Sequence, residues 1–183
     1  MSGFAEFDQY DGIGLADLVR RREVKPEEIL EAAIARVEAR NPAVNAVVSR
    51  LYDEARAAIR AGLPVGPFTG VPYLLKDLGT LYAGAITSAG SRLFADYRAD
   101  HDSEITARLK RAGLVIFGKT NTPEFGLSAS TEPRLFGATC NPWNLSYSAG
   151  GSSGGAAAAV AAGMLPTAAA PFGFPRRAAG SSA

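Results

Sequence analysis

Two serines set among four glycines form the segment of this chain with the clearest chemical potential. Gly150-Gly151-Ser152-Ser153-Gly154-Gly155 is followed by the small-residue run Ala156–Val160. Glycines let a backbone adopt positive φ and approach a ligand closely, and a helix that follows would present free N–H groups to that ligand. The pattern predicts a loop that binds an anion or a developing oxyanion. It is not a P-loop, because no Gly-Lys-Ser/Thr follows, and a flexible Gly/Ser linker is the alternative.

Lys76 is the second candidate, because it ends a short apolar segment, Val71-Pro72-Tyr73-Leu74-Leu75. An amine in such a place is partly desolvated, which lowers its pKa and makes its neutral form accessible. A neutral amine can act as a general base for a serine hydroxyl. Two ordinary alternatives stay open, in which the side chain extends to solvent or pairs with Asp77.

Two other reactive side chains are weaker candidates. His101 is the only histidine and lies in a polar turn beside Asp100 and Asp102. A Ser-His-Asp triad would need one of these carboxylates, and a structural or solvent-exposed role fits a polar turn better. Cys140 is the only cysteine, and the chain has no second histidine to activate it, so we predict a buried small side chain there.

The composition narrows the class of protein. The chain has 183 residues, of which 47% are hydrophobic and 20% charged, which fits about one globular domain. A net charge of +1 gives no reason to expect nucleic acid or a membrane surface as a partner. One histidine and one cysteine are too few for a disulfide framework or most zinc sites, so no metal or other cofactor is expected. The N-terminus lacks a basic signal region, so we expect a cytoplasmic location.

The spacing of apolar residues and the positions of helix breakers predict the elements that must hold these side chains. Asn41-Pro42 should end the second helix, residues 44–48 fit either a short strand or a helix start, and 62–72 and 146–155 should be loops. The order strand, helix, strand favours a mixed or parallel α/β sheet flanked by helices, with the two apolar strands at its centre. The predicted helices are Ile13–Arg22, Lys25–Arg40, Tyr52–Ala61, Glu104–Ala112 and Ala156–Ala162, and the predicted strands are Val71–Leu75 and Leu114–Phe117.

Several segments, taken together and in order, resemble the amidase signature family. The resemblance runs from about Gly14 to Pro166, and the combination of motifs is highly specific although no single motif is. The chain is most similar to bacterial amidases of the 6-aminohexanoate cyclic-dimer hydrolase type. The family motifs are Gly70–Asp77, Gly118–Glu124, Gly137–Leu145 and Gly150–Gly155, and the narrower match rests on Tyr97–Asp102 and Thr131–Pro133.

The resemblance implies a fold, a reaction and roles for two residues. The fold is a mixed β-sheet flanked by helices, and the reaction is metal-free hydrolysis of carbon–nitrogen bonds in linear or cyclic small-molecule amides. The family's triad is Ser, cis-Ser and Lys. Lys76 matches the lysine and Ser152 the bridging serine, so Lys76 would accept a proton through Ser152 from the nucleophile, and Ser152 would relay it to the leaving amine. The family includes the amidase subunit of a transamidation complex, so a non-catalytic or assembly subunit is the alternative.

The family's nucleophile has no counterpart in this sequence. It belongs to a segment of the type Asp-x-Gly-Gly-Ser-Ile-Arg, and the family spacing from Ser152 leads to Arg176, where no Gly-Gly-Ser occurs. Residues 166–177 can be encoded by codons that, read in a shifted frame, give Asp-Gly-Gly-Gly-Ser-Ile-Arg. We therefore predict that residues 1–166 are the N-terminal part of an amidase domain and 167–183 an out-of-frame tail. The chain alone should then be an incomplete, inactive amidase with exposed apolar sheet surface, while its substrate and oligomeric state stay open.

Overall fold

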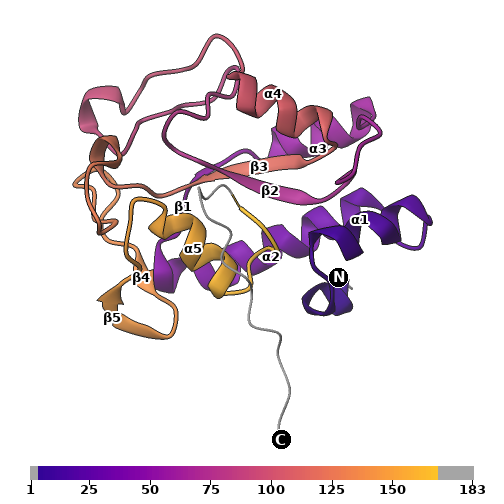
Figure 1. Ribbon diagram of the computed structural model, residues 1–183, viewed down its shortest axis with the longest axis horizontal. Helices are drawn as coiled ribbons and strands as arrows, with labels where there is room; N and C mark the ends of the chain where they lie inside the picture. Colours follow the sequence, from indigo (N-terminus) through magenta and orange to yellow (C-terminus); the bar gives the residue numbers. More distant parts are fainter. Residues whose placement is uncertain (1–3, 169–183) are drawn as a thin grey trace, which may run out of the picture.

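The computed structural model describes residues 4–168 of the chain (Figure 1). Every helix predicted from the sequence is present, with ends that differ by a few residues, and residues 44–48 lead into a strand rather than a helix. In chain order the elements are η1 Ala5–Gln9, α1 Gly12–Arg20, α2 Pro26–Val44, β1 Val47–Arg50, α3 Tyr52–Ala61, β2 Pro72–Lys76, η2 Arg92–Phe94, α4 Glu104–Arg111, β3 Val115–Thr120, η3 Glu124–Gly126, β4 Cys140–Asn141, β5 Asn144–Ser148 and α5 Gly154–Ala161.

Helix α2 begins at Pro26, as the sequence predicts, but the prediction that Asn41-Pro42 ends it is wrong. The helix continues to Val44. Pro42 falls in the last turn, where its missing N–H removes only one helical hydrogen bond. The turn is still closed, because the backbone N–H of Asn45 donates to the carbonyl of Asn41 at 2.8 Å.

The sheet is mixed, as predicted, and its strand order is β1-β3-β2. Strands β2 and β3 are parallel and are joined through a crossover that contains α4, whereas β1 is antiparallel to β3. The prediction that both apolar strands are central holds for β3 and is wrong for β2 within residues 4–168. Strand β2 lies at one end of the sheet, and its outer side has only an isolated parallel bridge from Leu74 to Ala168.

Strand β3 divides the apolar interior into two parts. Its six residues are all buried, as expected of a strand that is covered on both faces. Val115 and Phe117 join the larger core with α1, α2 and α5, while Ile116 joins a smaller core with Leu75, against which Leu109 of α4 packs. Figure 1 shows α1, α2 and α5 on one side of the sheet and α4 on the other. This alternation follows from the period of two along a strand.

The predicted loop 146–155 is wrong at both ends. Strand β5 runs to Ser148 and pairs with β4 in a hairpin, and α5 begins at Gly154. Gly155 lies in α5, which packs so closely there that a Cβ at this position would lie 2.4 Å from the backbone nitrogen of Asn121. The helix therefore starts inside the glycine-rich motif rather than after it.

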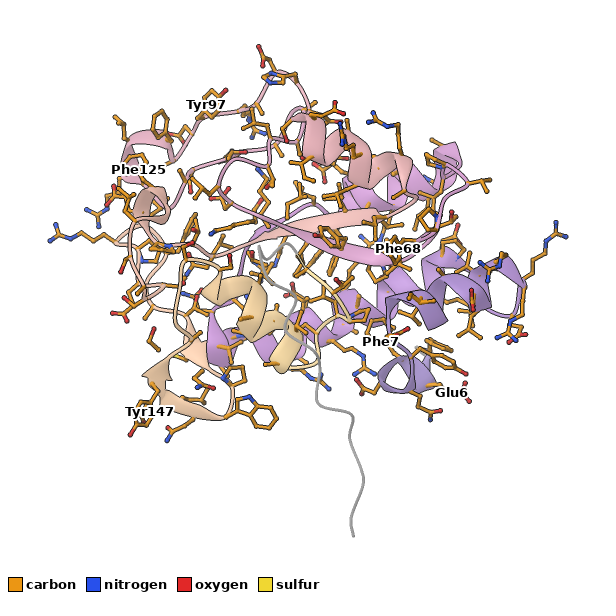
Figure 2. All side chains as sticks on the ribbon, in the orientation of Figure 1. Glu6, Phe7, Phe68, Tyr97, Phe125 and Tyr147 are labelled. Carbon is orange, nitrogen blue, oxygen red and sulfur yellow. The ribbon has the colours of Figure 1, made fainter. Side chains whose placement is uncertain are left out.

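Exposed large apolar side chains are spread over the described surface, and three of them lie on the β4–β5 hairpin. Trp143, Leu145 and Tyr147 are 75%, 50% and 66% exposed, and Figure 2 shows Tyr147 at the outer side of the hairpin. Leu145 and Tyr147 are two residues apart and so lie on one face of β5, whereas Trp143 belongs to the turn before it. Strand β3 of the main sheet is buried on both faces, so the exposed apolar sheet surface expected from the sequence does not lie on this strand.

One buried side chain holds the connection between α2 and β1. Asn41 is 7% exposed. Its Oδ1 accepts from the backbone N–H groups of Ala46 and Val47 at 2.8 and 2.7 Å, and its Nδ2 donates to the carbonyl of Val47 at 2.9 Å. These bonds satisfy backbone groups at the point where the chain leaves the helix and has no helical partner for them.

We predict that Asn41→Ala lowers the free energy of unfolding by about 3 kcal/mol, because it leaves buried backbone groups without partners. Glu38→Ala is the matched control on the exposed side of α2, where Glu38 pairs with Arg50 at 2.7 Å. Such a surface pair contributes less than about 1 kcal/mol. Urea denaturation of the two variants measures the difference, and equal losses of stability would contradict the role given to Asn41.

Candidate functional site

The end of β2 lies beside the loop that precedes α5. Lys76 is the last residue of β2, and its Nζ donates to Ser152 Oγ at 2.8 Å and to Ser153 Oγ at 3.1 Å. The peptide bond between Gly151 and Ser152 is cis. The structure thus brings together the lysine and the serine that the sequence singled out, although they are 76 residues apart in the chain.

Lys76 has neither of the two ordinary roles considered for it. Its side chain is half-buried instead of reaching into bulk solvent, and Asp77 forms its ion pair with Lys119. The reason is geometric, because neighbouring side chains at the end of a strand project to opposite sides. Burial lowers the pKa of the Lys76 amine below its ordinary value, as the sequence predicts. The neutral amine that a general base requires is therefore more accessible than in a free lysine.

Two buried threonines hold the loop in place. Thr131 Oγ1 donates to the carbonyl of Gly150 at 2.8 Å and accepts from the backbone N–H of Gly154 at 3.2 Å, so it closes the loop at both ends. Thr122 Oγ1 donates to the carbonyl of Ser152 at 3.2 Å. Sequence reasoning did not assign a role to either threonine. Their only signal was their place inside segments that resemble the family.

The glycines of the loop allow a close approach between backbones. A Cβ at Gly151 would lie 2.8 Å from the carbonyl oxygen of Ser128 and 3.0 Å from the carbonyl carbon of Ala129. Any side chain at this position would therefore displace the loop or the segment beneath it. The loop packs against its neighbours and is hydrogen-bonded at both ends, so the alternative of a Gly/Ser linker is wrong.

A buried ion pair lies at the ends of β2 and β3. Lys119 is fully buried and Asp77 is 1% exposed, with 3.8 Å between Lys119 Nζ and Asp77 Oδ1. Lys119 Nζ also donates to Thr87 Oγ1. The backbone N–H of Ser88 lies 3.2 Å from both oxygens of Asp77, and the Ser88 hydroxyl donates to Asp77 Oδ2. Every charge and hydroxyl in this group has a partner, as a buried polar cluster requires.

Burial acts against both charges of this pair. It lowers the pKa of Lys119 to about 8, although the charge of Asp77 opposes the change. It also raises the pKa of the Asp77 carboxyl, against hydrogen bonds from Ser88 and the charge of Lys119. Sequence reasoning missed the pair, since Asp77 entered only as a possible partner of Lys76 and Lys119 only as part of a motif. A charged residue directly after each apolar strand was the available signal.

The two weaker candidates lie outside this site. His101 is 63% exposed in its side chain, and its Nδ1 lies 2.6 Å from Asp100 Oδ1. Asp102 instead binds Lys110 Nζ at 2.6 Å. The expectation of an exposed histidine is confirmed, and no triad forms around it. The prediction that Cys140 is buried is wrong, because it lies half-buried on β4 of the largely exposed hairpin.

Two further properties concern the described part of the chain only. Within residues 4–168, no group of three or more His, Cys, Asp or Glu side chains is arranged to hold a metal ion. None of the helices in that range is long and apolar enough to cross a membrane.

Comparison with known proteins identifies the family. The Amidase family model matches residues 28–170. The 6-aminohexanoate-cyclic-dimer hydrolase of Paenarthrobacter ureafaciens is 50% identical over 160 residues, which cover 86% of this chain and 32% of that protein. A glutamyl-tRNA(Gln) amidotransferase subunit of Salinispora tropica is 41% identical over 157 residues, covering 80% of this chain and 31% of that protein. A solved structure of 6-aminohexanoate cyclic dimer hydrolase has a TM-score of 0.83 at 48% identity, over 88% of this chain and 33% of that chain.

The chain therefore belongs to the amidase family. The predicted amidase signature fold is confirmed, and the chain spans about a third of the length of these relatives. Residues 169–183 lie outside the described residues, so the boundary at Pro166 and the out-of-frame tail stay predictions.

The buried pair generates a prediction about pH. Lys119 has a pKa of about 8 in the folded chain, compared with about 10.4 for an unfolded lysine. The unfolded state therefore binds more protons between these two pH values, and the stability of the folded state rises with pH across that window, by up to about 3 kcal/mol. The measurement is the free energy of unfolding between pH 8 and 10.5.

The double variant Asp77→Asn/Lys119→Met should lose this part of the rise, because neither group then titrates. The matched control, Asp102→Asn/Lys110→Met, replaces a partly exposed pair on the surface and should keep it. A parent chain and an Asp77→Asn/Lys119→Met chain with the same slope would show that Lys119 is not the group responsible.

Proposed function

We propose that this chain supplies the general-base and relay half of a Ser–cis-Ser–Lys amidase that hydrolyses carbon–nitrogen bonds of small linear or cyclic amides. The observation that carries the proposal is the 2.8 Å hydrogen bond between Lys76 Nζ and Ser152 Oγ, beside a cis peptide bond. Membership of the amidase family and similarity to a hydrolase of a cyclic dimer support the class of reaction.

The proposed steps begin with the neutral amine of Lys76. It takes the proton of the Ser152 hydroxyl, while Ser152 takes the proton of a nucleophilic serine that attacks the amide carbonyl. The new bond joins the serine oxygen to the acyl carbon. When the carbon–nitrogen bond breaks, Ser152 gives a proton to the leaving amine and recovers one from Lys76. Water then hydrolyses the acyl-enzyme by the same route in reverse order.

Each side chain of the site has a defined task in these steps. Burial lowers the pKa of Lys76, which favours the neutral base. Thr122 holds the carbonyl of Ser152 and so fixes the residue that relays the proton. Ser153 is a second acceptor for the Lys76 amine, and we assign it to orientation of the amine, because at 9% exposure it is too enclosed to attack a substrate.

The nucleophilic serine of the proposed reaction is not among the 183 residues of this chain. No Gly-Gly-Ser follows Ser152 at the family spacing, so we propose that the chain alone is an inactive amidase segment. We also propose a cytoplasmic location. A net charge of +1 supports the separate proposal that the chain has no nucleic-acid or membrane partner.

A role as a non-catalytic or assembly subunit is the second candidate. It is favoured by 41% identity to a subunit of a glutamyl-tRNA(Gln) amidotransferase. The two candidates differ in whether a completed protein hydrolyses free amides without a partner protein.

We predict that the purified chain does not hydrolyse a simple aryl amide above the rate of a Lys76→Ala control. Without a nucleophile no acyl-enzyme can form, and only substrate binding and electrostatic stabilisation could still accelerate hydrolysis. Release of the aryl amine is followed by absorbance. Turnover by the parent chain that Lys76→Ala abolishes would overturn the proposal of inactivity.

Sequencing the DNA across Pro166, followed by repair of the reading frame and expression of the downstream segment, tests the proposed reaction itself. The repaired protein should hydrolyse amides, and Lys76→Ala and Ser152→Ala should each lower kcat/KM by about 10³-fold or more. His101→Ala is the matched control and should change kcat/KM less than about 2-fold, because an exposed side chain outside the site contributes little. A repaired protein that folds but hydrolyses no amide or ester in a broad panel would contradict the amidase proposal and favour the assembly role.

A further inference from the structure

The buried pair of Asp77 and Lys119 has no part in the proposed proton transfers, yet Asp77 directly follows the proposed base in the chain. A buried ion pair is weak evidence for stability, because removing two charges from water offsets much of their attraction. Asp77 and Lys119 are at most 1% exposed, so we looked for a role of these two charges other than stabilising the fold.

The pair connects the segments that carry the site. Strands β2 and β3 align Leu75 with Lys119 and Lys76 with Thr120. The backbone N–H of Asp77 donates to the carbonyl of Thr120 at 3.1 Å, which extends the pairing by one residue. Two residues after Thr120, Thr122 holds the carbonyl of Ser152. The end of β2 thus carries Lys76, and the segment after β3 holds Ser152 through Thr122.

The other contacts of the pair fix these strand ends from the far side. Asp77 accepts from Ser88, and Lys119 donates to Thr87. Thr87 and Ser88 therefore link Lys119 at the end of β3 to Asp77 directly after β2. If one charge of the pair is removed, the other is left buried without a counter-charge, and the strand end must move toward water to relieve it.

We propose that the balanced Asp77–Lys119 pair is a positioning device that holds Lys76 against Ser152. Lys76 matters here as the proposed general base, so this proposal rests on the proposed function. Asp77 and Lys119 are positioning residues, because neither contacts Ser152 in the described part of the chain.

The test observes Lys76 directly in the full chain. Four lysines are present, so selective ¹³Cε labelling of lysine gives a spectrum that single Lys→Arg variants can assign. The ¹³Cε resonance and the titration midpoint of Lys76 are recorded for the parent chain. Ser152→Ala gives the reference spectrum of a Lys76 that has lost its contact with Ser152 and keeps the one with Ser153.

The proposal predicts that Asp77→Asn and Lys119→Met each move the Lys76 resonance toward its position in Ser152→Ala. Lys119→Met should also raise the titration midpoint by about 0.5 pKa units or more, because the released amine becomes better solvated and a nearby positive charge is removed. The double variant Asp77→Asn/Lys119→Met leaves no unpaired charge and should restore the parent spectrum of Lys76. The matched control Asp102→Asn/Lys110→Met should not move it.

Two results would overturn the proposal. One is a folded single variant, checked by circular dichroism, whose Lys76 resonance and midpoint are those of the parent chain. The other is a folded double variant shifted as far as the single variants, since charge balance would then not be the cause.

If the single variants do not fold, Thr87→Val and Ser88→Ala decide the question. Each removes one hydrogen bond to the pair and should shift Lys76 in the same direction by a smaller amount. Unchanged Lys76 signals in both would refute the proposal. The spectrum reports the position of Lys76 and does not measure hydrolysis. An inactive repaired protein would therefore contradict the proposed function and leave the outcome of this test unchanged.

Discussion

The parallel pairing of β2 with β3 is the constraint on which the rest of the structure depends. It aligns Lys76 with Thr120, so the side chains that follow each strand meet at one edge of the sheet. Parallel strands need a crossover, which the segment with α4 supplies, and both faces of such a strand must be covered. The larger core between the sheet and α1, α2 and α5 meets that requirement on one face, and the smaller core under α4 meets it on the other.

The second requirement is a close approach of the loop before α5 to this edge. Small residues make the approach possible, because a side chain at Gly151 would overlap the backbone of Ser128 and Ala129. Hydrogen bonds from Thr131 and Thr122 then fix the loop. The result is a lysine amine with two serine hydroxyls within 3.1 Å, which is an arrangement suited to moving protons rather than to binding a metal ion.

Burial lowers the pKa of both lysines at the strand ends, but the two amines have different partners. Lys76 is partly desolvated and its amine contacts two serine hydroxyl groups. Burial lowers the pKa of this amine, so a larger fraction of it is neutral. Lys119 is fully buried and has a carboxylate to balance it. The two lysines are therefore not equivalent: the site uses the first as a proposed base, and the second is paired within the polar group beneath it.

The family, the class of fold, most helices and the two side chains that meet in the site can be predicted from the amino-acid sequence alone. These features are local or follow from motif order: Pro26 starts α2, the apolar runs form β2 and β3, and the glycine-rich motif permits a tight loop. The tertiary structure decided the rest. Pro42 stays inside α2 because the last turn tolerates the missing N–H, and position 155 of α5 requires glycine because the helix packs on the backbone of Asn121. Asp77 pairs with Lys119 and not with its neighbour Lys76, since adjacent side chains point to opposite sides of the strand and the partner is supplied by β3, a strand distant in the chain.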